Sequence, residues 1–109
     1  MRDFGGPKAR LPARTGIKVV VDITVNAGGL GATTVTIEGK DKASGKYYTL
    51  LASAALSAIA TTVLTVFPKA TAVANLTAND ALPDVYRIRC TGNGNPMTFT
   101  IGWSTLAPA

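Results

Sequence analysis

The chain has 109 residues, a formal net charge of +5 and an apolar content of 47%, with only 6% aromatic residues. It contains no histidine and a single cysteine, Cys90. Histidine-based acid–base catalysis, most zinc sites and an internal disulfide are therefore excluded. The length fits one domain that folds without covalent support, and the remaining side-chain chemistry favours a protein that binds or builds over an enzyme.

The positive charge is concentrated at the N-terminus. Residues 1–18 carry five basic side chains and one acidic one, whereas residues 19–109 carry six and five. Residues 1–16 contain two prolines and three glycines without apolar periodicity, which predicts an extended arm instead of a helix or strand. We expect this arm to dock on an acidic surface or along a neighbouring subunit; a solvated basic tail is the alternative. The residues expected to make that contact are Arg2, Phe4, Lys8, Arg10, Leu11 and Arg14.

The first half of the body reads as strands. Residues 17–25 alternate apolar and polar side chains, the period of a half-buried strand, and residues 33–40 repeat the pattern. The segment 41–45 ends in a glycine suited to a turn, and residues 46–51 run back as the partner strand, which predicts a hairpin.

Residues 47–68 carry no charge, so a transmembrane segment has to be weighed there. Six Ser and Thr side chains dilute its hydropathy, and residues 61–67 are β-branched up to a proline. We therefore predict two short strands, divided near residues 57–60, in place of a membrane span.

The second half ends in two further predicted strands. Residues 69–82 are compatible with a single helical turn or with a surface loop and short strand. Residues 84–91 alternate, the Asn-Gly pair within 92–96 predicts a hairpin turn, and residues 97–104 place Met, Phe, Ile and Trp on one face as a core stripe.

The predicted fold class is all-β, an antiparallel β-sandwich of about seven strands with an extended N-terminal arm. The expected division is an arm over 1–16, the sandwich over 17–106 and a short tail over 107–109. A small closed barrel is the alternative, because periodicity alone does not separate the two architectures.

Motifs for catalysis or cofactor binding are weak. Gly45-Lys46 lacks the Ser or Thr that a phosphate-binding loop requires and falls in a hairpin. Cys90 shares a strand face with Ile88, which predicts a small core residue, and the carboxylates of Asp80 and Asp84 flank a proline where Asp commonly bonds to the backbone. We expect no catalytic residues, no cofactor, no metal and no small-molecule substrate.

Arg87 and Arg89 lie on one face of their predicted strand, opposite Tyr86 and Ile88. Two outward guanidinium groups about 7 Å apart could clamp a carboxylate of a partner or two phosphates. An equally good interpretation is a cross-strand ion pair with Asp22 or Glu38.

The outward strand faces are rich in Thr and nearly free of charge. Isolated proteins usually guard sheet edges with Lys or Pro, so a surface of this kind fits a protein whose neighbours cover it. The residues concerned are Thr33, Thr34, Thr36, Thr98, Thr100 and Ser104.

Four stretches share their pattern with a known kind of protein: GIKVVVD at 16–22, IEGKDKASGKY at 37–47, LPDVYRI at 82–88 and FTIG at 99–102. In these stretches, residues 15–106 resemble small structural proteins of tailed bacteriophages, of the capsid decoration or minor capsid type. The resemblance implies a β-sandwich displayed in many copies on a virion, and it carries over no functional residue.

We therefore expect a non-enzymatic virion protein, made in the host cytoplasm, that decorates or cements a bacteriophage capsid. Its expected partners are the major capsid protein and neighbouring copies of itself, with no membrane partner and with nucleic acid disfavoured. The alternatives are a component of the phage tail or collar, or a free small module that binds nucleic acid or carbohydrate.

Overall fold

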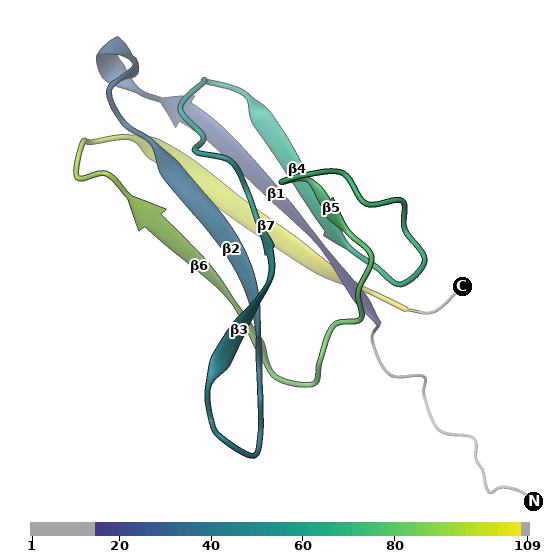
Figure 1. Cartoon of the computed structure of the whole chain (residues 1–109). Coiled ribbons are helices and arrows are strands. Elements are labelled where there is room, and N and C mark those ends of the chain that lie inside the picture. Colours follow the sequence, from purple (N-terminus) through teal and green to yellow (C-terminus); the bar gives the residue numbers. More distant parts are fainter. Residues whose placement is uncertain (1–14, 108–109) are drawn as a thin grey trace, which may run out of the picture.

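A computed structural model describes residues 15–107, which form two stacked β-sheets (Figure 1). The seven strands are β1 Gly16–Val25, β2 Thr33–Lys40, β3 Tyr47–Ala52, β4 Thr61–Val66, β5 Thr77–Ala78, β6 Tyr86–Gly92 and β7 Thr98–Leu106. A short 3-10 turn, η1 Ala27–Gly29, follows β1. The predicted all-β sandwich is confirmed. The expected arm residues from Arg2 to Arg14 lie outside the described residues.

The sheets have the orders β5-β4-β1-β7 and β3-β2-β6. All strand pairs are antiparallel except β4 with the two-residue β5. Two separate sheets mean that the barrel alternative is wrong: β6 and β7, the edge strands that closure would have to join, form no ladder.

The core sits between β1 and β2. Ile17, Val19, Val21 and Ile23 of β1 are at most 2% exposed, as the period-two pattern predicted. Val35 and Ile37 of β2 face them across the sandwich and are fully buried. Each such side chain contributes about 1.5–3 kcal/mol through its removal from water. The core is completed by Leu51, Leu64, Val66 and Leu82.

The hairpin predicted for residues 33–51 is confirmed, because β2 pairs with β3 from Lys40–Tyr47 onward. Its turn uses Gly45 at φ +75°, a left-handed conformation that glycine adopts without steric penalty. The Asp41 carboxylate accepts hydrogen bonds from the Ala43 amide at 3.3 Å and the Ser44 hydroxyl at 2.8 Å. These bonds lower the pKa of Asp41, chiefly through the Ser44 hydroxyl.

The uncharged segment 47–68 contains β3 and β4, so the membrane-span alternative is wrong for this stretch. Within residues 15–107, no helix has the length and apolar character needed to cross a bilayer. The undecided segment 69–82 forms a tight turn around Val73–Leu76 and then β5, in agreement with the loop and short-strand interpretation.

One prediction fails in an informative way. The Asn-Gly turn was expected to join two paired strands, but β6 pairs only with β2 and β7 only with β1 among the described strands. The connection Asn93–Met97 crosses from one sheet to the other. Local turn chemistry indicates a reversal of the chain, but partner choice depends on which sheet can bury each apolar face. β6 pairs with β2, where Cys90 lies opposite the buried Val35, and β7 pairs with β1, where Ile101 lies opposite the buried Val21.

Candidate interaction surface

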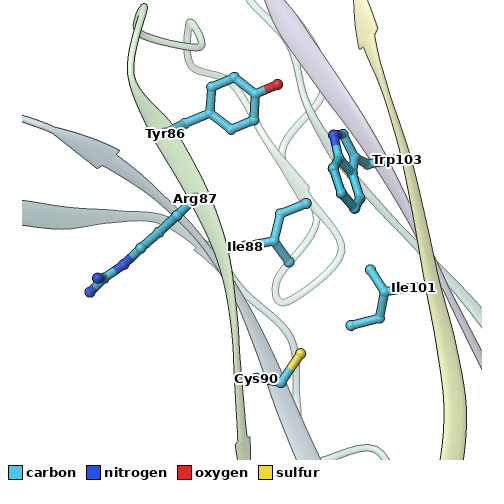
Figure 2. A pocket seen from close by; sticks show the side chains of 6 residues that line it. All are labelled: Tyr86, Arg87, Ile88, Cys90, Ile101 and Trp103. Carbon is cyan, nitrogen blue, oxygen red and sulfur yellow. The ribbon is translucent and has the colours of Figure 1, made fainter.

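β6 and β7 are edge strands of the two sheets and border a common hollow, and we call this region the open side. Figure 2 shows Tyr86, Ile88 and Cys90 of β6 directed toward Ile101 and Trp103 of β7, with Arg87 pointing the other way. These residues border a cleft of about 430 Å³. The open side is therefore defined by the inward side chains of both edge strands: Tyr86, Ile88, Cys90, Phe99, Ile101 and Trp103.

The cleft continues along the sandwich toward the connection between β6 and β7. A second hollow of about 450 Å³ shares Cys90 with the first and is lined further on by Phe99, Met97 and Pro96. Together the two hollows run along most of both strands, between Tyr86 at one end and the Asn93–Met97 connection at the other.

The opposite side of the sandwich is closed by contrast. There the Asn75 side-chain amide donates a hydrogen bond to the Ala52 carbonyl at 3.1 Å, which ties the turn before β5 to β3. Leu50, Leu56 and Ala78 pack against the core on this side. Among residues 15–107, no hydrogen bond ties β6 to β7, and the hollows between these two strands border the apolar interior.

The orientation of the β7 backbone follows from a hydrogen bond in the neighbouring strand. The Ile23 amide donates to the Ala60 carbonyl at 3.1 Å. Because the backbone groups of successive residues in a strand point to opposite sides, the N–H and C=O groups of odd-numbered residues of β1 bond to β4, and those of even-numbered residues bond to β7. Lys18 pairs with Ser104, so even-numbered residues of β7 bond back to β1. The residues that turn their N–H and C=O groups to the free edge are Phe99, Ile101, Trp103 and Thr105.

The same reasoning applies to β6. The Lys40 amide donates to the Val85 carbonyl at 2.9 Å, which assigns the odd-numbered residues of β6 to β2. Tyr86, Ile88 and Cys90 consequently present their backbone groups outward. On both edges, the residues with unused backbone groups are the ones whose apolar side chains line the cleft.

The β7 edge carries none of the usual protections against strand addition. Thr98–Leu106 contains no charged residue and no proline over nine residues. Trp103 is 58% exposed, although it faces the inner side of its sheet opposite Val19. Ile101 and Phe99 are only half-buried. An exposed, uncharged, apolar edge of this length is a template for pairing with another strand.

The second predicted site, Arg87 and Arg89, lies on the outer face of β6. The Arg87 Nε–H donates to Glu38 Oε1 at 2.6 Å, and Arg89 Nε lies 3.8 Å from the same oxygen. The Arg87 guanidinium also stacks on the ring of Tyr47, with Cζ 3.7 Å from the centroid. Of the two cross-strand pairings considered, the one with Glu38 is confirmed, whereas Asp22 belongs to the other sheet and accepts from Thr61.

This cluster acts first as a structural element. The Glu38 side chain is only 8% exposed, and a buried carboxylate requires charge-assisted hydrogen bonds. Arg87 supplies the shortest one and covers Tyr47. The guanidinium group of Arg87 is therefore engaged within the fold, which weakens the case for a phosphate clamp at this place.

The prediction that Cys90 is a small core residue is wrong. Its side chain lies on the inner face with Ile88, as expected, but it is exposed at the open side instead of buried in the core. Partial burial raises the pKa of the Cys90 thiol, which lowers its thiolate fraction at neutral pH. The environment does not activate a nucleophile.

The remaining sequence candidates form no catalytic arrangement. Asp84 pairs with Lys42 at 3.0 Å on the surface, and the Asp80 carboxylate accepts from the Ala81 amide at 2.8 Å. The Gly45-Lys46 pair lies in the β2–β3 turn and exposes no phosphate-binding loop. Within residues 15–107, no cluster of three or more His, Cys, Asp or Glu side chains is placed to hold a metal ion.

The open side itself was missed by sequence reasoning. The sequence predicts that Met97, Phe99, Ile101 and Trp103 belong to the core. These side chains do lie on the inner face of their sheet, but the opposite sheet covers them only in part. The signal that could have identified the open side is the absence of charge and proline over residues 98–106, a stretch that contains the only tryptophan of the chain.

Comparison with protein-family models, with curated proteins and with solved structures finds no match to this chain.

Proposed function

We propose that the protein is a non-enzymatic structural subunit of a virion, which decorates or cements a bacteriophage capsid. The observation that carries this proposal is the open side, where two adjacent strand edges leave apolar side chains and unpaired backbone groups uncovered. A surface of this composition is advantageous in a protein that works inside an assembly, because a neighbour both buries the side chains and completes the hydrogen bonds.

The choice of a capsid as the assembly rests on the resemblance of residues 15–106 to phage structural proteins. The charge distribution fits it, since basic groups concentrated ahead of a nearly neutral body can approach the carboxylates of a shell. In this arrangement, residues 1–14 and the open side serve as two separate attachment regions of one subunit.

Location in the particle tests the proposal. Antibodies raised against residues 15–107 are applied to phage particles released by cells that carry the gene, and bound gold label is imaged by electron microscopy. Label over the head supports capsid decoration. Label confined to the tail or collar assigns the protein to that structure and contradicts the capsid proposal.

Absence of label from purified particles, with the protein free in the lysate, would overturn a virion role altogether. In that case the isolated protein should be titrated with DNA at several salt concentrations. An affinity that falls steeply with salt would identify a nucleic-acid-binding module instead.

A further inference from the structure

We propose that the open side is filled by a second copy of this chain, through antiparallel pairing of β7 with β7 of the partner copy about a two-fold axis at Gly102. This inference deepens the proposed function, because it names the surface through which copies join, and it rests on the proposal that the protein builds an assembly. The solution experiments below fail or succeed independently of any capsid.

The backbone of β7 is suited to pairing with itself. Its outward N–H and C=O groups belong to odd-numbered residues, so a two-fold axis at an even-numbered residue aligns these groups symmetrically. With the axis at Gly102, Ile101 lies opposite the partner's Trp103 and Phe99 opposite the partner's Thr105. All nine residues of β7 then pair, with about eight new backbone hydrogen bonds.

The side chains support the same arrangement. A two-fold axis perpendicular to the joined sheet places both β3-β2-β6 sheets on one side, so the two open sides face each other. Trp103 would pass from 58% exposure into an apolar environment beside the partner's Ile101, a favourable cross-strand pair of aromatic and β-branched residues.

Association would cover the apolar surface that the open side still exposes. Trp103 contributes the largest share, because it is 58% exposed, whereas Tyr86, Phe99 and Ile101 are already partly buried. The newly buried area is therefore smaller than the roughly 800 Å² per partner of standard stable complexes, and the backbone pairing of β7 has to contribute to the affinity.

Charge does not oppose the pairing, although each copy carries a net +5. Residues 98–106 contain no charge. On β6, the Arg87 side chain points away from the cleft (Figure 2), and the guanidinium groups of Arg87 and Arg89 both approach Glu38. Two copies of β7 therefore meet without like charges directly opposed across the joint.

Residues 1–14 are a poorer occupant of the same cleft. Pro7 and Pro12 lack the N–H that a paired strand must donate. Phe4 and Leu11 are seven positions apart and would point to opposite faces of an extended segment. The segment also brings four basic side chains to an apolar cleft. A second β7 meets the requirements that this segment does not.

The first test measures association of the full chain. Sedimentation velocity over a wide concentration range should show a monomer converting to a dimer. Because Trp103 is the only tryptophan, its fluorescence emission should shift to the blue over the same concentrations as its exposed ring is covered. A monomer at all concentrations, with unchanged Trp103 emission, would overturn the proposal.

The second test examines the register. In a Cys90→Ser background, Gly102→Cys places two thiols directly opposite, in a non-hydrogen-bonded pair with Cα atoms about 4.5 Å apart, within the range of a disulfide. A Cβ atom at position 102 meets no heavy atom within 4 Å, so the substitution is compatible with the fold. Mild oxidation should yield a covalent dimer.

Ser104→Cys in the same background is the matched control. Its two thiols would lie about 14 Å apart along the paired strands and should cross-link at least about tenfold less. Equal cross-linking of the two variants would refute the register at Gly102.

The competing occupant is tested in the full chain by Phe4→Ser combined with Leu11→Ser. A dimer that persists, with Trp103 still shielded, supports pairing through β7. Loss of the dimer or renewed exposure of Trp103 would assign the cleft to residues 1–14 and overturn the proposal. A dimer in solution together with particles that lack the protein would refute the capsid function alone.

Discussion

At the residue scale, Glu38 determines how the outer face of the β3-β2-β6 sheet is arranged. Its carboxylate is buried on the middle strand, where Thr36 is buried as well, so β2 is covered on both faces. The cover over Glu38 comes from long side chains, since Arg87 stacks on Tyr47 and bonds to Glu38. A charged residue on a nominally outward face is thus part of the packed structure.

The two arginines are predicted to contribute unequally. Arg87→Ala should lower the free energy of unfolding by about 1–3 kcal/mol, because it leaves the Glu38 carboxylate without its shortest charged hydrogen bond; the 44% exposure of Arg87 keeps the cost in this range. Arg89→Ala removes a 3.8 Å contact from a 56% exposed side chain and should change stability by less than about 0.5 kcal/mol. Urea denaturation of both variants checks this, and equal losses would contradict it.

At the scale of elements, the sequence predicts strands better than it predicts partners. The nine-residue alternation of β1 and the Gly45 turn determine a strand and a hairpin from local chemistry alone, and both are present. The Asn-Gly turn after β6 is also local, but β6 and β7 pair in different sheets. The open side arises from this non-local choice, which is why the candidate surface could not be predicted although its residues and their face could.

The β2–β3 turn allows a titration prediction. The Asp41 pKa is lowered in the folded chain, mainly by the Ser44 hydroxyl, so the turn gains stability above the ordinary carboxyl pKa and loses it as pH falls through the lowered value. Ser44→Ala should therefore raise the Asp41 pKa toward its ordinary range, as followed by NMR. Ser104→Ala, in the other sheet, should leave it unchanged; an unaltered titration in Ser44→Ala would refute the assignment.

At the scale of the whole molecule, the excess positive charge and the apolar β7 edge belong to different parts of the sequence. Basic side chains are concentrated in residues 1–18, and the body carries a net charge near zero. The two proposed attachment modes should therefore respond differently to salt, since screening weakens contacts between exposed charges and leaves an uncharged strand edge intact.

Replacing Arg2, Lys8, Arg10 and Arg14 together by Gln should slow attachment to phage heads by at least about tenfold at low salt, through loss of electrostatic steering. Replacing Lys40, Lys42, Lys46 and Lys69 by Gln removes the same charge from the body and should have a smaller effect. Cosedimentation with heads from a strain that lacks the gene measures both. Equal losses would mean that net charge alone governs attachment. Neither set should abolish the dimer.

The pairing of β1 with β7 also has a consequence for synthesis. Val19 leaves the ribosome long before its partner Trp103, while the β2–β3 hairpin can form as soon as it emerges. During synthesis, β1 therefore lacks its partner strand β7 until the end of the chain has been translated. A nascent chain interrupted before β7 thus lacks the edge to which we assign self-association, and such a truncated product could not join the dimer that we propose.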